Sequence, residues 1–270
     1  MEYIFKQYEG TDVFSDLEQL LISLFRSVGM WVPQFSIPLF ISYMRNDISR
    51  IVIKGESQEL KQHLQHRRSE GTRVNINLIG EVVLGEKEAH ERMAKYQHAL
   101  QNPDIDYISI KISTIFSQIT PLAHEWTVTQ LQERLTQIYR SAMQNTFIDT
   151  NGNTTAKFVN LDMEEYRDLH LTLDAFKATL SLDEFKKYHA GIVLQAYLPD
   201  TLDELRSLAA WAKERVQKGG APIKVRLVKG ANQEMELTEA SLRHWECVTY
   251  LKKEFSDANY KIAMDFLLDP

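Results

Sequence analysis

The chain has 270 residues, 44% of them hydrophobic and 25% charged, which is typical of a globular protein with one sizeable core. Its 31 basic and 37 acidic residues are interspersed and sum to a formal charge of −6, so no basic stripe is available for a nucleic-acid backbone. The single cysteine, Cys247, excludes an internal disulfide, and the start of the chain has no signal-peptide pattern, so we expect a cytoplasmic protein.

Residues 1–73 predict a helical arm. An amphipathic segment at 14–27 precedes an apolar run at 31–43, and a charged stretch then ends at 66–68 in His-Arg-Arg. We interpret the arm as a cover for the side or bottom of the following domain. Contact with a membrane surface is the alternative, although acidic residues interrupt the polar face of the amphipathic segment.

Residues 74–270 alternate between β-rich runs and stretches with helical periodicity. The β-rich runs are 74–80, 107–113, 158–163, 192–197 and 223–230, and the helical stretches are 86–101, 122–145, 165–188, 200–218 and 233–253. Such alternation predicts parallel strands joined by right-handed crossovers, either in an open doubly wound sheet or in a (β/α)8 barrel.

The pattern within the strands favours the barrel. In the second strand Ile108 and Ile110 share one face, while Ser109 and Lys111 share the other. A parallel sheet covered by helices on both faces would be apolar throughout. We therefore predict an incomplete α/β barrel of the TIM type, with about five β-α units, whose inward polar residues meet at the C-terminal mouth. These residues are Asn77, Lys111, Asp162, Gln195 and Arg226. Mutual hydrogen bonding inside a polar barrel is the alternative explanation for any one of them.

Two of these residues suggest chemistry at neighbouring strand ends. Lys111 and Asp162 would each keep the other ionised if they formed a pair. The alternative is a Schiff-base role for Lys111, as in class I aldolases, but a nearby carboxylate works against the neutral amine that this role requires. Glu164 and Glu165 read as acids in the first turn of the next helix. The eight histidines have no metal-binding spacing, so no metal site is predicted.

The turn after the fifth strand suggests a phosphate site. Gly230 and Ala231 allow the backbone to approach a ligand closely, and a helix that begins near Asn232 offers free N–H groups. The simpler reading is that Asn232 only caps that helix. Arg226 on the inward face adds a fixed cation, which would favour the electron-rich reduced ring of a flavin.

Five sequence blocks resemble the proline dehydrogenase domain of bacterial bifunctional proline-utilisation flavoenzymes. They are NINLIGE (75–81), SIKIS (109–113), FVNLDMEEYRDL (158–169), GIVLQAYLPD (191–200) and GGAPIKVRLVKGAN (219–232). The resemblance implies a distorted (β/α)8 barrel that binds FAD and oxidises L-proline to Δ1-pyrroline-5-carboxylate. It also implies electron transfer to a membrane quinone, which would bring the protein to the inner face of the membrane as a peripheral contact.

The same resemblance implies roles for individual residues. Lys111 would contact the substrate carboxylate, and Asp162 would order the substrate pocket. Gln195 and Arg226 would contact the flavin ring, with Arg226 near its N5 edge. The ribityl and pyrophosphate groups would be held by Val228, Lys229, Gly230 and Ala231.

Two departures from the family pattern affect this interpretation. Many members have Tyr-Trp where this chain has Asn232 and Gln233, so the aromatic contacts of that motif are not expected here. The family also has a later Tyr-x-x-Arg-Arg motif that grips the proline carboxylate, and this motif does not occur in these 270 residues. We likewise expect no aldehyde dehydrogenase domain, the second domain of the bifunctional members, within them. We therefore expect a C-terminally truncated fragment with little activity alone. An inactive fragment that associates with a larger subunit is a further alternative.

Overall fold

The structure is a computed structural model that describes residues 19–20, 23, 32–48, 57–78, 80, 82–149 and 152–268. The chain divides into two compact units, Met1–His63 and Leu64–Pro270. Our division of the chain after residue 73, by contrast, stays a prediction.

The first unit contains helix α3 (Pro33–Ile48), which confirms a helical reading of the apolar run. Several of its apolar side chains are exposed, among them Phe35 and Leu39. The amphipathic segment predicted at 14–27 lies largely outside the described residues. Across the part of the chain that the structure describes, no helix is both long and apolar enough to span a membrane.

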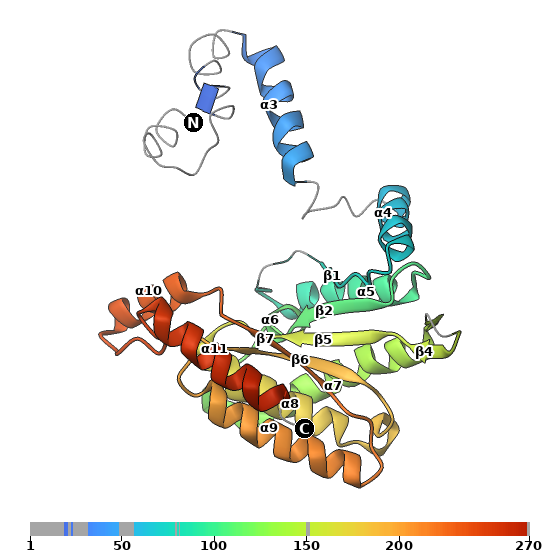
Figure 1. Ribbon diagram of the computed structural model, residues 1–270, viewed down its shortest axis with the longest axis vertical. Helices are drawn as coiled ribbons and strands as arrows, with labels where there is room; N and C mark the ends of the chain where they lie inside the picture. The colour runs from blue at the N-terminus through green and yellow to red at the C-terminus, as the bar shows by residue number, and fades with distance from the viewer. Residues whose placement is uncertain are drawn as a thin grey trace. The chain divides into compact units, whose positions relative to one another are not determined.

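The second unit is built on a five-stranded parallel sheet with the order β1-β2-β5-β6-β7 (Figure 1). The strands are β1 (Ile76–Asn77), β2 (Tyr107–Lys111), β5 (Phe158–Asp162), β6 (Ala190–Gln195) and β7 (Lys224–Val228). Each strand of this sheet pairs with the next one along the chain. A doubly wound sheet reverses its order at a switch point, whereas a barrel adds its strands in sequence. The order therefore favours the barrel, as the polar strand faces predicted.

Helices follow four of the strands at the predicted places. They are α5 (Glu86–Gln101), α7 (His124–Gln144), α8 (Leu169–Leu180) and α9 (Thr201–Gln217). Helices α5, α7 and α9 each bury one stripe, and α7, for example, buries Leu131, Leu135 and Ile138, whereas α8 is buried over most of its surface. The helices pack on their neighbours, α5 on α7 and α7 on α8, and they also contact the strands β2, β5 and β6. These contacts create the apolar core outside the sheet.

Some predicted boundaries are wrong for local reasons. The helix expected at 233–253 ends early, as α10 (Gln233–Arg243), because His244 adopts a left-handed conformation with φ 55°; the next helix, α11 (Lys253–Leu268), begins only at the end of the predicted range. Helix α11 then lies against α9 and β7 (Figure 1). The stretch 165–188 is likewise divided, since the short 3-10 helices η3 (Tyr166–Asp168) and η4 (Asp183–Phe185) flank α8.

Two further features were missed. Strand β2 ends at Lys111, where the short helix α6 (Ile112–Ile115) begins, so Ser113 is not a strand residue. Between α7 and β5 the chain forms a hairpin of β3 (Thr146–Ile148) and β4 (Thr154–Ala156). Its turn includes Gly152 at φ 82°, a conformation that favours glycine.

Side chains from three strands close the N-terminal end of the sheet. The Lys224 ammonium lies 5.1 Å from the ring centroid of Tyr107 and 5.6 Å from that of Phe158, and the two rings meet edge to face. Gly191 leaves the space they need, since an added Cβ would lie within 2.6 Å of the Asn160 amide oxygen and 2.9 Å of the Phe158 ring. These side chains thus cover the N-terminal end of the sheet, while the polar C-terminal ends of the strands lie at its opposite end.

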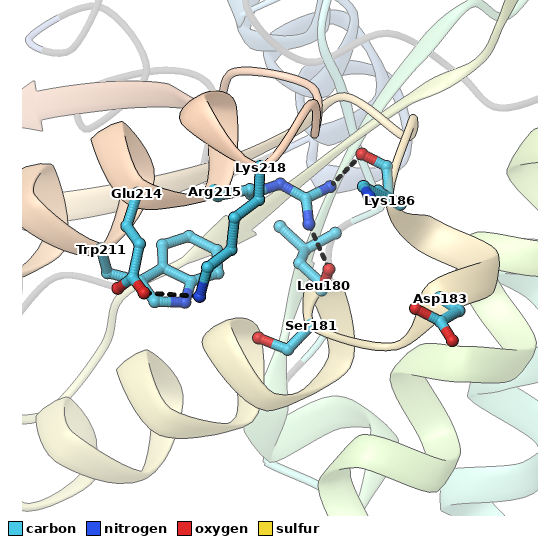
Figure 2. Close-up of a pocket in the computed structure, with 8 residues that line it drawn as sticks. All are labelled: Leu180, Ser181, Asp183, Lys186, Trp211, Glu214, Arg215 and Lys218. Atoms are coloured by element: carbon cyan, nitrogen blue, oxygen red, sulfur yellow. Dashed lines mark hydrogen bonds and ion pairs between the residues drawn. The ribbon is translucent and has the colours of Figure 1, made fainter.

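Arg215 of α9 joins the loops at the same end of the fold. The residue is 9% exposed, and its guanidinium donates to the main-chain oxygens of five residues. These are Leu180, Phe185, Lys186, Tyr188 and Ala221. Figure 2 shows the guanidinium reaching Leu180 and Lys186 beside a surface pocket that Trp211 also lines. One buried cation therefore holds the end of α8, η4 and the approaches to β6 and β7.

Replacement of Arg215 by Met should lower the free energy of unfolding by about 3 kcal/mol or more, because abandoned buried carbonyls each cost about 1–3 kcal/mol. The matched control is Arg206→Met, which removes an exposed pair with Asp203 and should cost under about 1 kcal/mol. Urea unfolding of the whole chain measures both. Equal losses in the two variants would contradict the role given to Arg215.

Candidate active site

Asp162 is the centre of the polar cluster at the C-terminal ends of the strands. It ends β5 and is 7% exposed. Its Oδ1 atom accepts hydrogen bonds from Asn160 Nδ2 at 2.7 Å, Ser109 Oγ at 3.2 Å and Arg226 Nη2 at 2.7 Å. Burial raises the pKa of Asp162, while Arg226, Ser109 and Asn160 oppose the rise. Three strands thus converge on one carboxylate oxygen.

Lys111 has a different partner from the one we predicted. Its Cα atom pairs with that of Asp162 across β2 and β5, but its ammonium lies 2.9 Å from Oε1 of Glu164. The other oxygen of Glu164 accepts a hydrogen bond from the Ser113 hydroxyl. The reading of Glu164 as a first-turn helix acid is therefore wrong. Residues 163–165 form no helix, and they carry Glu164 beyond the end of β5 to Lys111.

Gln195 reaches the same segment from β6. Its Nε2 atom donates to the main-chain oxygen of Glu164 at 3.2 Å. Its Oε1 atom is buried without a hydrogen-bond partner, and so is Nε of Arg226. A buried acceptor and a buried donor that lack partners in the described structure suit a ligand with a polar edge. Asn77, by contrast, is exposed at the end of β1, and its side chain makes no hydrogen bond or ion pair with a described residue of the cluster.

The structure thus brings three of the five predicted mouth residues to the segment Asp162–Glu164, which itself contains the fourth, Asp162. Lys111 contacts the Glu164 carboxylate, and Arg226 contacts the Asp162 carboxylate. Gln195 contacts the main-chain oxygen of Glu164. This arrangement provides two cations, two carboxylates and an amide within one partly open site.

The turn after β7 is closely packed, as the glycine in its sequence led us to predict. Gly230 has φ 124°, and an added Cβ would lie 2.4 Å from the Tyr197 ring. Val228 ends β7, and Ala231 is exposed in the turn. The Lys229 ammonium forms an ion pair with Asp257 of α11, so a ligand phosphate would have to replace that carboxylate.

Asn232 does not act as the side-chain cap considered from the sequence. It precedes α10 without a side-chain cap hydrogen bond, although its main-chain oxygen accepts from the N–H of Glu236. The Glu236 carboxylate is 8% exposed and accepts from the N–H of Tyr166 at 2.7 Å. The start of α10 is therefore tied to η3 on the far side of the mouth.

Asp168 is a buried acid that sequence reasoning missed. It is 5% exposed, and its Oδ1 atom has no hydrogen-bond partner. Burial raises the pKa of Asp168 to about 6; Arg167 opposes the rise, and Glu165, Glu164 and Glu236 add to it. The available signal was the density of acids between 162 and 168, which places like charges around any buried member.

Replacement of Asp168 by Asn should stabilise the protein at neutral pH. A pKa raised from 3.8 to about 6 means that the native protein binds the proton more tightly than the unfolded chain. The stability that Asp168 contributes is present below about pH 4 and lost as the pH rises through 6. Urea unfolding should give Asp168→Asn an advantage of about 2 kcal/mol at pH 7.5 that shrinks towards pH 4. A pH-independent difference would contradict this assignment.

Comparison with known proteins gives the site its context. A family model described as proline dehydrogenase matches residues 60–270. Proline utilization A from Corynebacterium freiburgense is 39% identical, with a TM-score of 0.77 over 96% of this chain and 25% of that one. The Bdellovibrio bacteriovorus protein, inactivated by N-propargylglycine, is 32% identical, with a TM-score of 0.73 over 87% of this chain and 26% of that one.

A Bradyrhizobium japonicum proline utilization A mutant shares the fold at 22% identity, with a TM-score of 0.68 over 89% of this chain and 25% of that one. No curated protein matches the chain. The chain spans about a quarter of the length of these solved structures. The in-order parallel sheet and the similarity to the Corynebacterium structure identify a TIM-barrel type fold. Since the family model covers well over half of the sequence, the chain belongs to the proline dehydrogenase family.

Proposed function

We propose that this chain oxidises L-proline to Δ1-pyrroline-5-carboxylate, using FAD at the barrel mouth and a quinone as the final electron acceptor. The observation that carries the proposal is the cluster of Lys111, Asp162, Gln195 and Arg226 at the strand ends of a proline dehydrogenase family member. Strand C-termini are where barrel enzymes hold their substrates. Transfer to a membrane quinone would require a peripheral contact with the membrane surface.

The mouth has features that fit the polar edge of a flavin. Gln195 Oε1 offers a buried, unpaired acceptor, and Arg226 Nε offers a buried, unpaired donor. The backbone from Val228 to Ala231 would hold the ribityl and pyrophosphate groups, with Lys229 exchanging Asp257 for phosphate. When bound, FAD supplies a two-electron oxidant, and the fixed charge of Arg226 favours its reduced form.

The substrate end of the mouth is assigned to Lys111. One of its three N–H donors faces Glu164, and the other two are free to bind a carboxylate. Conversion of the ring C–N bond to C=N removes two electrons and two protons from proline. The chain contributes by holding the substrate carboxylate on Lys111 and by ordering the floor of the pocket through Asp162.

The ion pair of Lys111 weighs against a Schiff-base enzyme. Imine formation needs a neutral lysine amine, whereas the Glu164 carboxylate at 2.9 Å stabilises the charged ammonium. Flavin-dependent oxidation requires no neutral lysine. The geometry therefore favours the dehydrogenase over the lysine-imine alternative.

The purified chain should bind FAD and, under anaerobic conditions, slowly lose its visible flavin absorbance when L-proline is added, in keeping with the low activity that the sequence predicts for the chain alone. Replacement of Lys111 by Met should preserve FAD binding but raise the proline concentration needed by about 10–100-fold, the effect of losing a charged hydrogen bond worth about 1.5–3 kcal/mol. Lys218→Met, which removes an exposed pair with Glu214, is the control. Reoxidation by a soluble quinone would identify the acceptor.

Each other outcome would contradict a separate part of the proposal. Bound flavin that stays oxidised would mean that this chain does not oxidise proline. Failure to bind FAD would contradict the cofactor assignment. Trapping of a carbonyl substrate on Lys111 by borohydride would instead support the lysine-imine enzyme.

A further inference from the structure

Two ion pairs lie at the C-terminal ends of the strands, and either cation could pair with either carboxylate. Arg226 Nη2 contacts Asp162 at 2.7 Å, and Lys111 Nζ contacts Glu164 at 2.9 Å. Lys111 and Asp162 are direct partners in the register of β2 and β5. Lys111 is therefore within reach of the carboxylate that binds Arg226, but it points to Glu164 instead.

Glu164 is held firmly in the position that makes this separation. Its carboxylate is 17% exposed and accepts from Ser113 as well as from Lys111. Its main-chain oxygen accepts from Gln195. Contacts from α6 and β6 thus fix both the side chain and the backbone of Glu164, so the carboxylate cannot simply follow a moving lysine.

We infer that Glu164 is a positioning residue that keeps the two ion pairs apart, by holding Lys111 on the substrate side and leaving Asp162 to Arg226 on the cofactor side. The naming of the two sides rests on the proposed function. Without Glu164, Lys111 would still lie opposite Asp162 in the register of β2 and β5, and two cations would then share one buried acid. Arg226 would lose part of its anchor, because opposite charges at a few ångströms dominate such a site.

The inference predicts a specific dependence between variants. Glu164→Gln should weaken the energetic coupling between Asp162 and Arg226, although Glu164 touches neither side chain. Removal of the intruding lysine in the double variant Lys111→Met/Glu164→Gln should restore that coupling. If Glu164 had only a structural role, the coupling between Asp162 and Arg226 would fall in Glu164→Gln, and the added Lys111→Met would not restore it.

The coupling is measured by double-mutant cycles with Asp162→Asn and Arg226→Met, from urea unfolding of the full chain in each background. The matched control is Glu165→Gln, because Glu165 lies on the same segment but pairs with Arg167. We expect the coupling to be intact in the wild-type, Glu165→Gln and Lys111→Met/Glu164→Gln backgrounds and reduced in Glu164→Gln. Unchanged coupling in Glu164→Gln, or an equal loss in the double variant, would overturn the inference.

FAD affinity gives a second measurement if a cycle variant does not fold. Glu164→Gln should bind FAD about tenfold more weakly, as expected for the loss of one charged hydrogen bond, and the added Lys111→Met should recover most of that affinity. No recovery would again overturn the inference. If the coupling follows the expected pattern but the wild-type chain does not oxidise proline, the proposed function fails and the separation of the ion pairs stands.

Discussion

The buried carboxylate of Asp162 is the constraint on which the barrel mouth depends. Desolvation penalises a charge at this depth, so the fold must supply donors to it. Ser109 comes from β2, Asn160 from β5 itself and Arg226 from β7. Meeting this one requirement fixes the relative positions of three strands and aligns their inward side chains.

Much of the sheet could be predicted from the sequence, because the period of two in each strand reflects a physical difference between its faces. Ile108 and Ile110 point to the helices, while Ser109 and Lys111 point inward, and the inward face is the one that carries the site. The convergence of the polar strand ends followed from parallel pairing alone. Local alternation thus predicts which face of each strand carries the site, although Asn77 at the exposed end of β1 does not join it.

The choice of partners within the site could not be predicted in the same way. Lys111 and Asp162 are register neighbours, yet the length of the segment after β5 lets Glu164 take the lysine. The burial of Asp168 depends on how η3 packs, and the end of α10 depends on one left-handed residue, His244. Such features depend on loop geometry, which carries no periodic signal in the sequence.

The pairing of charges also limits how strongly this mouth can bind a small carboxylate. Lys111 and Arg226 are already paired with Glu164 and Asp162, so an incoming anion meets cations whose charge is partly neutralised. It is also repelled by Glu164, which lies next to the group that it seeks. Weaker ground-state binding raises the substrate concentration needed but does not by itself slow the reaction. A mouth organised in this way has lower affinity for anions but a fixed arrangement of its cations, and the oxidation that we propose would require such an arrangement.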